Sequence, residues 1–404
     1  MEQTYFRKGL GLKQEVAGAL SADYHSRLVD RVRGQNNEIS AGGLTFKLAQ
    51  EFGFCYGVDR AVDYAYQVAT KFPDQRVLLV GEIIHNPHVN SKLQAMGIVI
   101  LQPGSDGKFD FAGIDDDDVV IIPAFGVTVQ DLGRLRDIGC VLVDTTCGSV
   151  LNVWKRVEKY AKEGFTALIH GKHFHEESKA TASQVTRYPG GKYLLVRNMD
   201  EALIVCRFIE EGGDPASIEK RFQHAVSQGF SPSTDLDHIG VANQTTMLAN
   251  ESLAIAARVR ESIIARFGEE KLAEHFQSFD TICSATQERQ DAVLELIEQP
   301  LDAMIVIGGY NSSNTNNLAR ICSDRTTTYH INDADCIDPE RGTIRHKPVG
   351  SDSEVVVEDW LSQAKMTVAI TAGASTPNNK IGEAIERAMR TRGVEMGGSG
   401  EREP

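Results

Sequence analysis

Short runs of apolar, β-branched residues alternate along the chain with longer segments in which apolar residues recur at helical spacing. Runs this short and continuous are typical of strands buried on both faces of a parallel sheet. We predict strands at Leu44–Leu48, Val77–Val80, Val119–Ile122, Val141–Val143, Ala167–Ile169, Leu194–Val196, Ile239–Ala242, Met304–Ile307 and Met366–Ile370. Helices are predicted between them, as at Val58–Thr70, Ser149–Lys162 and Met247–Arg266. The alternation indicates an α/β protein with parallel sheets.

One plan recurs three times along the chain. Each copy has a cysteine between a strand-like segment and a helical one: Cys55, Cys147 and Cys283. Two of these share the pattern D-T-x-C, at Asp144–Cys147 and Asp280–Cys283. The match of cysteine and flanking elements indicates three related lobes.

Polar loops follow each cysteine at similar spacing, where the next strand ends. They are GEIIHNPH with His85, HGKHFHEE with His175, and GGYNSSNTN with Ser312. A second polar strand end follows in each copy: PAFGVT, NQTTM and TAGAST. Ligands of open parallel sheets bind outside the carboxyl ends of the strands. Three lobes related by a pseudo-threefold axis would therefore direct all these loops at one centre.

The repeat predicts lobes at 44–148, 149–282 and 283–392. Residues 1–43 are polar and end in Ala41-Gly42-Gly43, so we expect them to form an extension ahead of the core. Residues 393–404, GVEMGGSGEREP, are expected to be a disordered tail.

Three convergent thiolates suit a cubane iron–sulfur cluster in which one iron has no protein ligand. Such an iron can bind a substrate oxygen as a Lewis acid, and the cluster can carry electrons. Cysteines at strand ends are also consistent with core packing. That structural interpretation is assigned to the remaining cysteines: Cys140, Cys206, Cys322 and Cys336.

The polar loops suit a phosphate or diphosphate, because NSSNTNN offers hydroxyl, amide and backbone donors at a strand-to-helix turn. An ordinary helix cap would leave the same pattern. His85 and His175 are equally consistent with hydrogen-bonded loop histidines. Glu177 is a candidate proton donor, or else a solvated carboxylate like its neighbour Glu176.

Composition narrows the classes of function. The chain has 404 residues, 41% of them hydrophobic, and a formal net charge of −14. That charge argues against nucleic-acid binding, which needs clustered Lys and Arg. No apolar run approaches the length of a membrane span, and no signal segment is recognisable. With seven cysteines, an odd number, these features favour a reducing, cytoplasmic compartment.

A family resemblance rests on eight motifs in order: FGFCYGVDRAV, GEIIHNP, DTTCGSV, HEESKATAS, NQTTM, DTICSATQERQ, NSSNTNNLA and TAGASTPN. Together they resemble the 4-hydroxy-3-methylbut-2-enyl diphosphate reductases, which catalyse the last step of the non-mevalonate isoprenoid pathway. The extension resembles that of the longer plant and cyanobacterial members. The resemblance implies a three-lobed α/β fold around a central [4Fe–4S] cluster, and reduction of the substrate to isopentenyl and dimethylallyl diphosphate.

When each motif is matched to that of the family, the resemblance implies a role for individual residues. Cys55, Cys147 and Cys283 would bind the cluster. The diphosphate would be held by His85, His175, Ser312, Ser313, Asn314 and Ser375. Thr245, with Gln244 nearby, would lie at the substrate hydroxyl, and Glu177 would supply protons. The implied electron donor is a ferredoxin or a flavodoxin.

One segment departs from the family pattern. Many members have A-H-G-V, whose histidine helps to bind the diphosphate, whereas this chain has Ala124-Phe125-Gly126-Val127. Phe125 cannot donate a hydrogen bond to phosphate, so substrate affinity and product ratio are open questions.

Two other functions also fit a cysteine-bound cluster. A cluster-dependent hydro-lyase would act on a small phosphorylated substrate without external electrons. A non-enzymatic iron–sulfur sensor would bind no diphosphate. The sequence does not determine the electron donor, the product ratio, the oligomeric state or the role of residues 1–43.

Overall fold

The computed structural model describes residues 3–395. Most of the predicted disordered tail, from residue 396 on, lies outside this range. Contacts divide the chain into two compact units. Unit 1 comprises the residues up to Leu12, Arg60–Ile84 and Leu93–Thr286, and unit 2 comprises Lys13–Asp59, His85–Lys92 and the residues from Gln287 onward.

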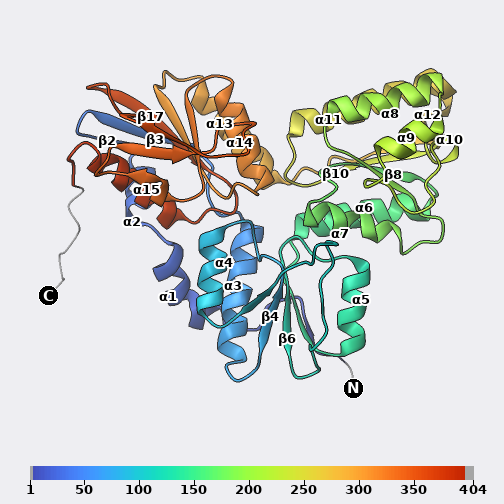
Figure 1. Ribbon diagram of the computed structural model, residues 1–404, viewed down its shortest axis with the longest axis horizontal. Coiled ribbons are helices and arrows are strands. Elements are labelled where there is room, and N and C mark those ends of the chain that lie inside the picture. The colour runs from blue at the N-terminus through green and yellow to red at the C-terminus, as the bar shows by residue number, and fades with distance from the viewer. Residues whose placement is uncertain (1–2, 396–404) are drawn as a thin grey trace. The chain divides into compact units, whose positions relative to one another are not determined.

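The first sheet of unit 1 has five parallel strands in the order β1-β7-β6-β4-β5. The strands are β1 (Tyr5–Phe6), β4 (Val77–Val80), β5 (Val99–Leu101), β6 (Val119–Ile122) and β7 (Val141–Asp144). Figure 1 shows β4 and β6 side by side, and every residue of both strands is buried. Helix α3 (Tyr56–Lys71) precedes β4 in the chain, α4 (Pro87–Ala95) follows β4, and α5 (Val129–Ile138) follows β6.

The second sheet of unit 1 has four parallel strands in the order β11-β10-β8-β9. They are β8 (Thr166–His170), β9 (Tyr193–Val196), β10 (Ile239–Asn243) and β11 (Phe276–Ser278). The helices are α6 (Gly148–Lys162), α7 (Glu176–Val185), α8 (Met199–Glu211), α9 (Pro215–Arg221), α10 (Pro232–Asp235), α11 (Ala249–Phe267) and α12 (Leu272–His275), with a 3-10 turn η1 at Glu269–Lys271. Helices α8 and α11 pack together (Figure 1).

Unit 2 contains a five-stranded sheet in the order β13-β12-β17-β3-β2, of which only the pair β2–β3 is antiparallel. Its strands are β2 (Glu38–Ala41), β3 (Leu44–Leu48), β12 (Ala303–Ile307), β13 (Thr328–Ile331) and β17 (Met366–Ala372). The other elements are α1 (Lys13–Tyr24), α2 (Arg27–Gly34), α13 (Ser284–Ile297), α14 (Ser313–Ser323), α15 (Asn378–Arg390), the 3-10 turn η2 (Ala334–Cys336) and a small antiparallel sheet of β14 (Ile337–Asp338), β15 (Thr343–His346) and β16 (Val355–Glu358).

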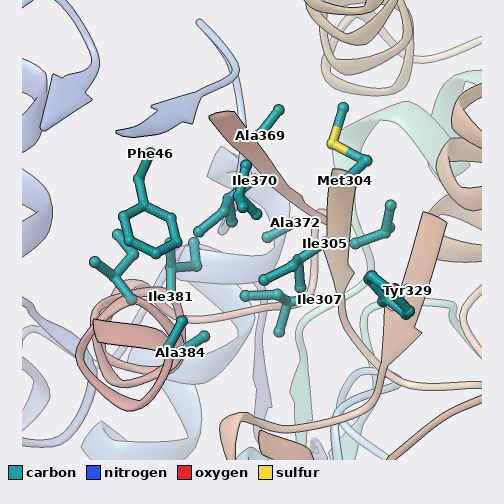
Figure 2. Close-up of a cluster of buried hydrophobic side chains, with 14 of the residues drawn as sticks. Phe46, Met304, Ile305, Ile307, Tyr329, Ala369, Ile370, Ala372, Ile381 and Ala384 are labelled. Carbon is teal, nitrogen blue, oxygen red and sulfur yellow. The ribbon is translucent and has the colours of Figure 1, made fainter. Parts of the chain in front are cut away.

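The core of unit 2 lies between the five-stranded sheet and its helices. Figure 2 shows Ile305 and Ile307 of β12 and Ile370 of β17 gathered with Ile381 of α15. Fully burying an aliphatic side chain of this size contributes about 1.5–3 kcal/mol. Because both faces of β12 are covered, its sequence AMIVI is apolar at every position.

The predicted α/β fold with parallel sheets is confirmed, and all nine predicted strands are present with ends shifted by at most a few residues. The strands absent from the prediction are two to four residues long, and β1 and β14 have only two. Such segments are too short to show an alternating pattern, so their pairing depends on the neighbouring strand.

The assignment of residues 44–48 to the first lobe is wrong. Strand β3 pairs in parallel with β17, in the register Met366↔Leu44 to Ile370↔Leu48, and so belongs to the third sheet. Residues 1–43 were expected to form an extension ahead of the core, but two of its strands belong to the sheets: β1 joins the first and β2 joins the third. Strands β1 and β3 pair with strands far away in the chain, which no local sequence pattern indicates, whereas β2 forms a hairpin with β3.

The three sheets share one strand order, which supports the repeat. In each, the strand before a cysteine lies next to the strand before the second polar loop, and the strand before the first polar loop comes next. The corresponding triplets are β7-β6-β4, β11-β10-β8 and β3-β17-β12.

Candidate functional site

Each predicted ligand cysteine lies directly before a helix: Cys55 before α3, Cys147 before α6 and Cys283 before α13. All three are half-buried. The N-terminus of a helix carries partial positive charge, which suits a negatively charged group there. The three positions therefore suit metal-binding sulfur.

The other four cysteines are buried. Burial raises the pKa of the Cys140 thiol to about 11 and that of Cys322 to about 12. Burial also raises the pKa of Cys206 and Cys336. These environments disfavour a thiolate, in agreement with the structural role predicted for all four.

Backbone hydrogen bonds join each cysteine to the second polar loop of its own sheet. Cys147 N–H donates to the Ala124 carbonyl at 3.0 Å, within PAFGVT. Cys283 N–H donates to the Thr245 carbonyl at 3.5 Å, within NQTTM. In unit 2, Cys55 N–H donates to the Ala374 carbonyl at 3.2 Å, within TAGAST. The polar strand ends and the cysteines therefore meet in the same way in all three sheets.

Glu177 lies at the start of α7, in the loop after β8, and is 1% exposed. Its carboxylate accepts hydrogen bonds from Thr245 N–H at 2.6 Å and from the Thr245 hydroxyl at 3.0 Å. Glu176 is exposed. The burial of Glu177 excludes the interpretation as a solvated carboxylate and leaves it a candidate proton donor.

His175 caps α7, its Nδ1 accepting a hydrogen bond from Glu177 N–H at 3.1 Å. Its ring packs edge-to-face with Phe125, the centroids 5.7 Å apart. The departure from the family pattern therefore lies against a predicted diphosphate ligand. A continuous series of contacts in unit 1 thus runs from Cys147 through the Phe125 loop, His175, Glu177 and Thr245 to Cys283.

Gln244 and Lys172 also belong to this part of unit 1. The Gln244 Oε1 accepts hydrogen bonds from Lys172 N–H at 3.2 Å and from the Ser178 hydroxyl at 3.1 Å, which fixes the loop after β8 to the loop after β10. Burial lowers the pKa of the Lys172 ammonium. Sequence reasoning gave Lys172 no role, because one lysine in a loop carries no pattern.

In unit 2, the predicted diphosphate residues gather at the N-terminus of α14. Ser312 caps this helix, its hydroxyl accepting from Thr315 N–H at 3.3 Å, and Ser313 is buried behind it. Asn314 accepts a hydrogen bond from Ala374 N–H at 2.9 Å. Its amide nitrogen, although buried, has no hydrogen-bond partner among the described residues.

Two more predicted residues belong to unit 2. The Nδ1 of His85 lies 3.3 Å from the amide nitrogen of Asn311, just before α14. Ser375 is half-buried in the turn between β17 and α15. The segments that carry the predicted anion ligands of this unit are thus joined to the Cys55 loop through Ala374.

Arg289 holds the Cys55 loop from α13. It is 3% exposed and donates to the Gly53 carbonyl, from Nη2 at 2.8 Å, and to the Phe54 carbonyl at 3.2 Å. Gly53 itself has φ +74°, and a Cβ there would lie 2.9 Å from Asn378 Oδ1, so the turn requires glycine. Sequence reasoning missed Arg289, although it lies within the motif DTICSATQERQ.

Within residues 3–395, no helix combines the length and the apolar character needed to cross a bilayer. This agrees with the sequence, in which no apolar run reaches that length.

The chain is similar to known proteins over almost its whole length. The family model described as LytB protein matches residues 46–389. The 4-hydroxy-3-methylbut-2-enyl diphosphate reductase of Microcystis aeruginosa is 46% identical over 384 residues, 95% of this chain and 94% of the relative. That of Thermosynechococcus vestitus is 45% identical over 393 residues, 97% and 96% of the two chains.

Solved structures give the same result. A structure of (E)-4-hydroxy-3-methyl-but-2-enyl diphosphate reductase matches with a TM-score of 0.50 and 25% identity, over 85% of this chain and 98% of the other. The Plasmodium falciparum E-1-hydroxy-2-methyl-but-2-enyl-4-diphosphate reductase has the same fold, with a TM-score of 0.61 and 20% identity over 84% and 86%. The predicted family is confirmed: the chain belongs to the LytB protein family.

Proposed function

We propose that this chain is a 4-hydroxy-3-methylbut-2-enyl diphosphate reductase that carries out the terminal step of the non-mevalonate pathway. The substrate takes up two electrons and two protons. Its allylic C–O bond breaks, water leaves, and a new C–H bond gives isopentenyl or dimethylallyl diphosphate. The observation that carries the proposal is the series of contacts joining Cys147, His175, Glu177, Thr245 and Cys283, in a chain that belongs to this family.

The cofactor is an iron–sulfur cluster, which supplies the electrons and a Lewis-acidic iron when it is bound. We propose a [4Fe–4S] cluster held by Cys55, Cys147 and Cys283, with one iron not ligated by protein. The three half-buried sulfurs at helix N-termini fit this group, whereas the four buried cysteines do not. Three protein ligands for four irons leave one coordination site for substrate.

The diphosphate has a matching set of donors. The N-terminus of α14 offers backbone N–H groups, and the buried amide nitrogen of Asn314 has no acceptor among residues 3–395. An anion at this helix end would satisfy both. We propose that Ser312, Ser313, Asn314 and Ser375 bind the diphosphate in unit 2, and that His85 and His175 contribute imidazole donors.

Proton transfer is assigned to Glu177. A hydroxyl is a poor leaving group until it is protonated. Glu177 is a buried carboxyl group that is hydrogen-bonded to Thr245. The Thr245 hydroxyl would orient the substrate hydroxyl and pass the proton from Glu177. A positioned general acid typically accelerates such a step by about 10²–10⁴-fold.

The first test uses anaerobically purified protein and a chemical reductant. We expect stoichiometric iron, substrate reduction, and turnover about 100-fold lower in Glu177→Gln. Glu176→Gln is the matched control, since its exposed carboxylate should be dispensable. Turnover without a reductant would instead indicate a hydro-lyase, and iron without diphosphate binding would indicate a sensor.

Phe125 bears on substrate affinity. Its contact with His175 places it beside a proposed diphosphate ligand, so Phe125→His should add a donor and lower the Michaelis constant. One new charge-assisted bond is worth about 1 kcal/mol or more. An unchanged or higher Michaelis constant would mean that this side chain does not face the phosphates.

We propose an acidic one-electron donor, a ferredoxin or a flavodoxin, that docks beside the Cys283 loop. A hollow of about 590 Å³ lies between α6 and this loop, and Lys155, Arg156, Phe279 and Asp280 are among its lining residues. Arg156 stacks on the exposed ring of Phe279 at 3.4 Å. On a chain of net charge −14, two cations and an exposed ring next to a ligand cysteine are complementary to an acidic electron carrier.

Docking can be separated from chemistry by changing the reductant. Lys155→Glu combined with Arg156→Gln should lower kcat/KM with ferredoxin about tenfold at low salt and leave turnover with a small chemical reductant unchanged. Lys162→Glu, at the far end of the same helix, is the control. Equal losses with both reductants would place the defect outside donor docking.

A further inference from the structure

The carboxylate of Asp144, three residues before Cys147, is buried, with its side chain 6% exposed. One oxygen, Oδ1, accepts a hydrogen bond from Thr146 N–H at 2.9 Å and so fixes the turn that leads to Cys147. The other, Oδ2, accepts from the Tyr5 hydroxyl at 2.6 Å and from Arg7 Nε at 3.1 Å. Asp144 therefore connects the N-terminal segment to the turn that carries Cys147.

Strand β1 is held in place independently of Asp144. It pairs in parallel with β7, and Leu142 N–H donates to the Thr4 carbonyl at 3.0 Å. The Gln3 amide donates to the Cys140 carbonyl at 2.8 Å, and Phe6 packs against Phe72 with ring centroids 6.2 Å apart. Tyr5 lies in β1 and Arg7 just after it, and both side chains reach the same oxygen of Asp144.

We propose that the N-terminal strand positions a cluster ligand: Tyr5 and Arg7 hold Asp144, and Asp144 fixes the turn that presents the Cys147 sulfur. The inference rests on the proposed function only in taking Cys147 as a ligand. It gives residues 3–7 a role in cofactor retention. Residues that orient metal ligands in this way typically change metal affinity or activity by about 10–100-fold when they are replaced.

The matched turn before Cys283 lacks this support. Asp280 also accepts a hydrogen bond from the N–H two residues on, Ile282, at 3.0 Å, but it is exposed. Within the described part of the chain, no residue of β1 forms a hydrogen bond with Asp280. If the N-terminal strand acts as proposed, its loss should affect Cys147 and spare Cys283.

The experiment follows iron release from the holoenzyme to a chelator while a thiol reagent labels each cysteine as it becomes accessible. Tyr5→Phe combined with Arg7→Gln removes both donors to Asp144 Oδ2, and Tyr5→Phe alone is the milder variant. Arg136→Gln is the control, because Arg136 lies 5.7 Å from the Tyr5 ring but forms no hydrogen bond with Asp144. Labelled peptides are quantified by mass spectrometry, and the melting temperature reports folding.

We expect the double variant to release iron about tenfold faster than wild type, with Cys147 labelled before Cys55 and Cys283. Arg136→Gln should match wild type in rate and order. Release at the wild-type rate, or faster labelling of all three cysteines together, would overturn the proposal. A wild-type protein without iron would contradict the proposed function instead, so the two failures are distinguishable.

Discussion

The two D-T-x-C turns of unit 1 have the same local structure and different surroundings. Asp144 and Asp280 each accept a hydrogen bond from the N–H two residues on, at 2.9 and 3.0 Å. Beyond that turn they diverge, because Asp144 is buried and is bonded by Tyr5 and Arg7, whereas Asp280 is exposed.

The sulfur atoms show the opposite difference. Cys283 Sγ accepts a hydrogen bond from Thr286 N–H at 3.3 Å and lies 3.1 Å from the Thr286 hydroxyl. Cys147 precedes α6 and makes no such side-chain bond to the helix. The turn before Cys147 is thus stabilised through the Asp144 side chain, whereas the turn before Cys283 is stabilised by contacts at the sulfur itself. The shared motif determines the turn, while the contacts that stabilise it come from other parts of the chain.

The largest effect is expected when either ligand cysteine is replaced, and here the two loops should behave alike. Cys147→Ser and Cys283→Ser should each lose the cluster and all activity, because serine is a poor ligand for iron in a thiolate site. Iron content and the visible spectrum measure this. Cys140→Ser is the control, since that thiol is buried and its pKa is raised. An active, iron-replete Cys147→Ser protein would remove the basis of the site assignment.

Replacing the aspartates should affect the two loops differently. Asp144→Asn keeps the acceptor for Thr146 but directs an amide donor at Tyr5 and Arg7, so iron release should rise about tenfold. Asp280→Asn keeps the same turn in solvent and should release iron close to the wild-type rate. The rate of iron release to a chelator is measured for both variants. Equal rates would show that the burial of Asp144 has no functional consequence.

A smaller effect is expected at the Cys283 sulfur. Thr286→Val removes the hydroxyl that lies 3.1 Å from Sγ and keeps the shape of the side chain. Hydrogen bonds to cluster sulfurs stabilise the added negative charge of the reduced state, so the reduction potential should fall. Redox titration followed by electron paramagnetic resonance measures the shift, and Thr286→Ser should restore the potential. A shift that persists in Thr286→Ser would point to packing as its cause.

The smallest effect concerns pH. Burial and the nearby Asp144 raise the pKa of the Tyr5 hydroxyl. A group with a raised folded-state pKa contributes its full stability below its unfolded-state pKa, about 10 for tyrosine, and loses it as the pH rises further. The stability of wild type over Tyr5→Phe should therefore be constant up to about pH 9 and shrink above pH 10. Denaturant unfolding at several pH values tests this, and a constant difference to pH 11 would contradict it.

Much of this protein follows from local sequence. Continuous apolar runs such as VLLV and VVII predicted the buried strands β4 and β6, since a strand covered on both faces needs apolar residues at every position. The three cysteines were predicted to precede helices, and they do. The sequence also named Glu177 as a candidate proton donor, and the structure shows that this side chain is buried at the start of α7.

Tertiary structure alone decided the remaining features. Leu44–Leu48 joined the third sheet because β17 offers it a parallel partner more than 300 residues away in the chain. Tyr5 and Arg7 reach Asp144 across separations of 139 and 137 residues, and Arg289 reaches Gly53 across 236. A two-residue strand and a single buried arginine carry no periodicity. Their partners are selected by which surfaces meet when the sheets and helices pack, and that information is not local to any segment of the sequence.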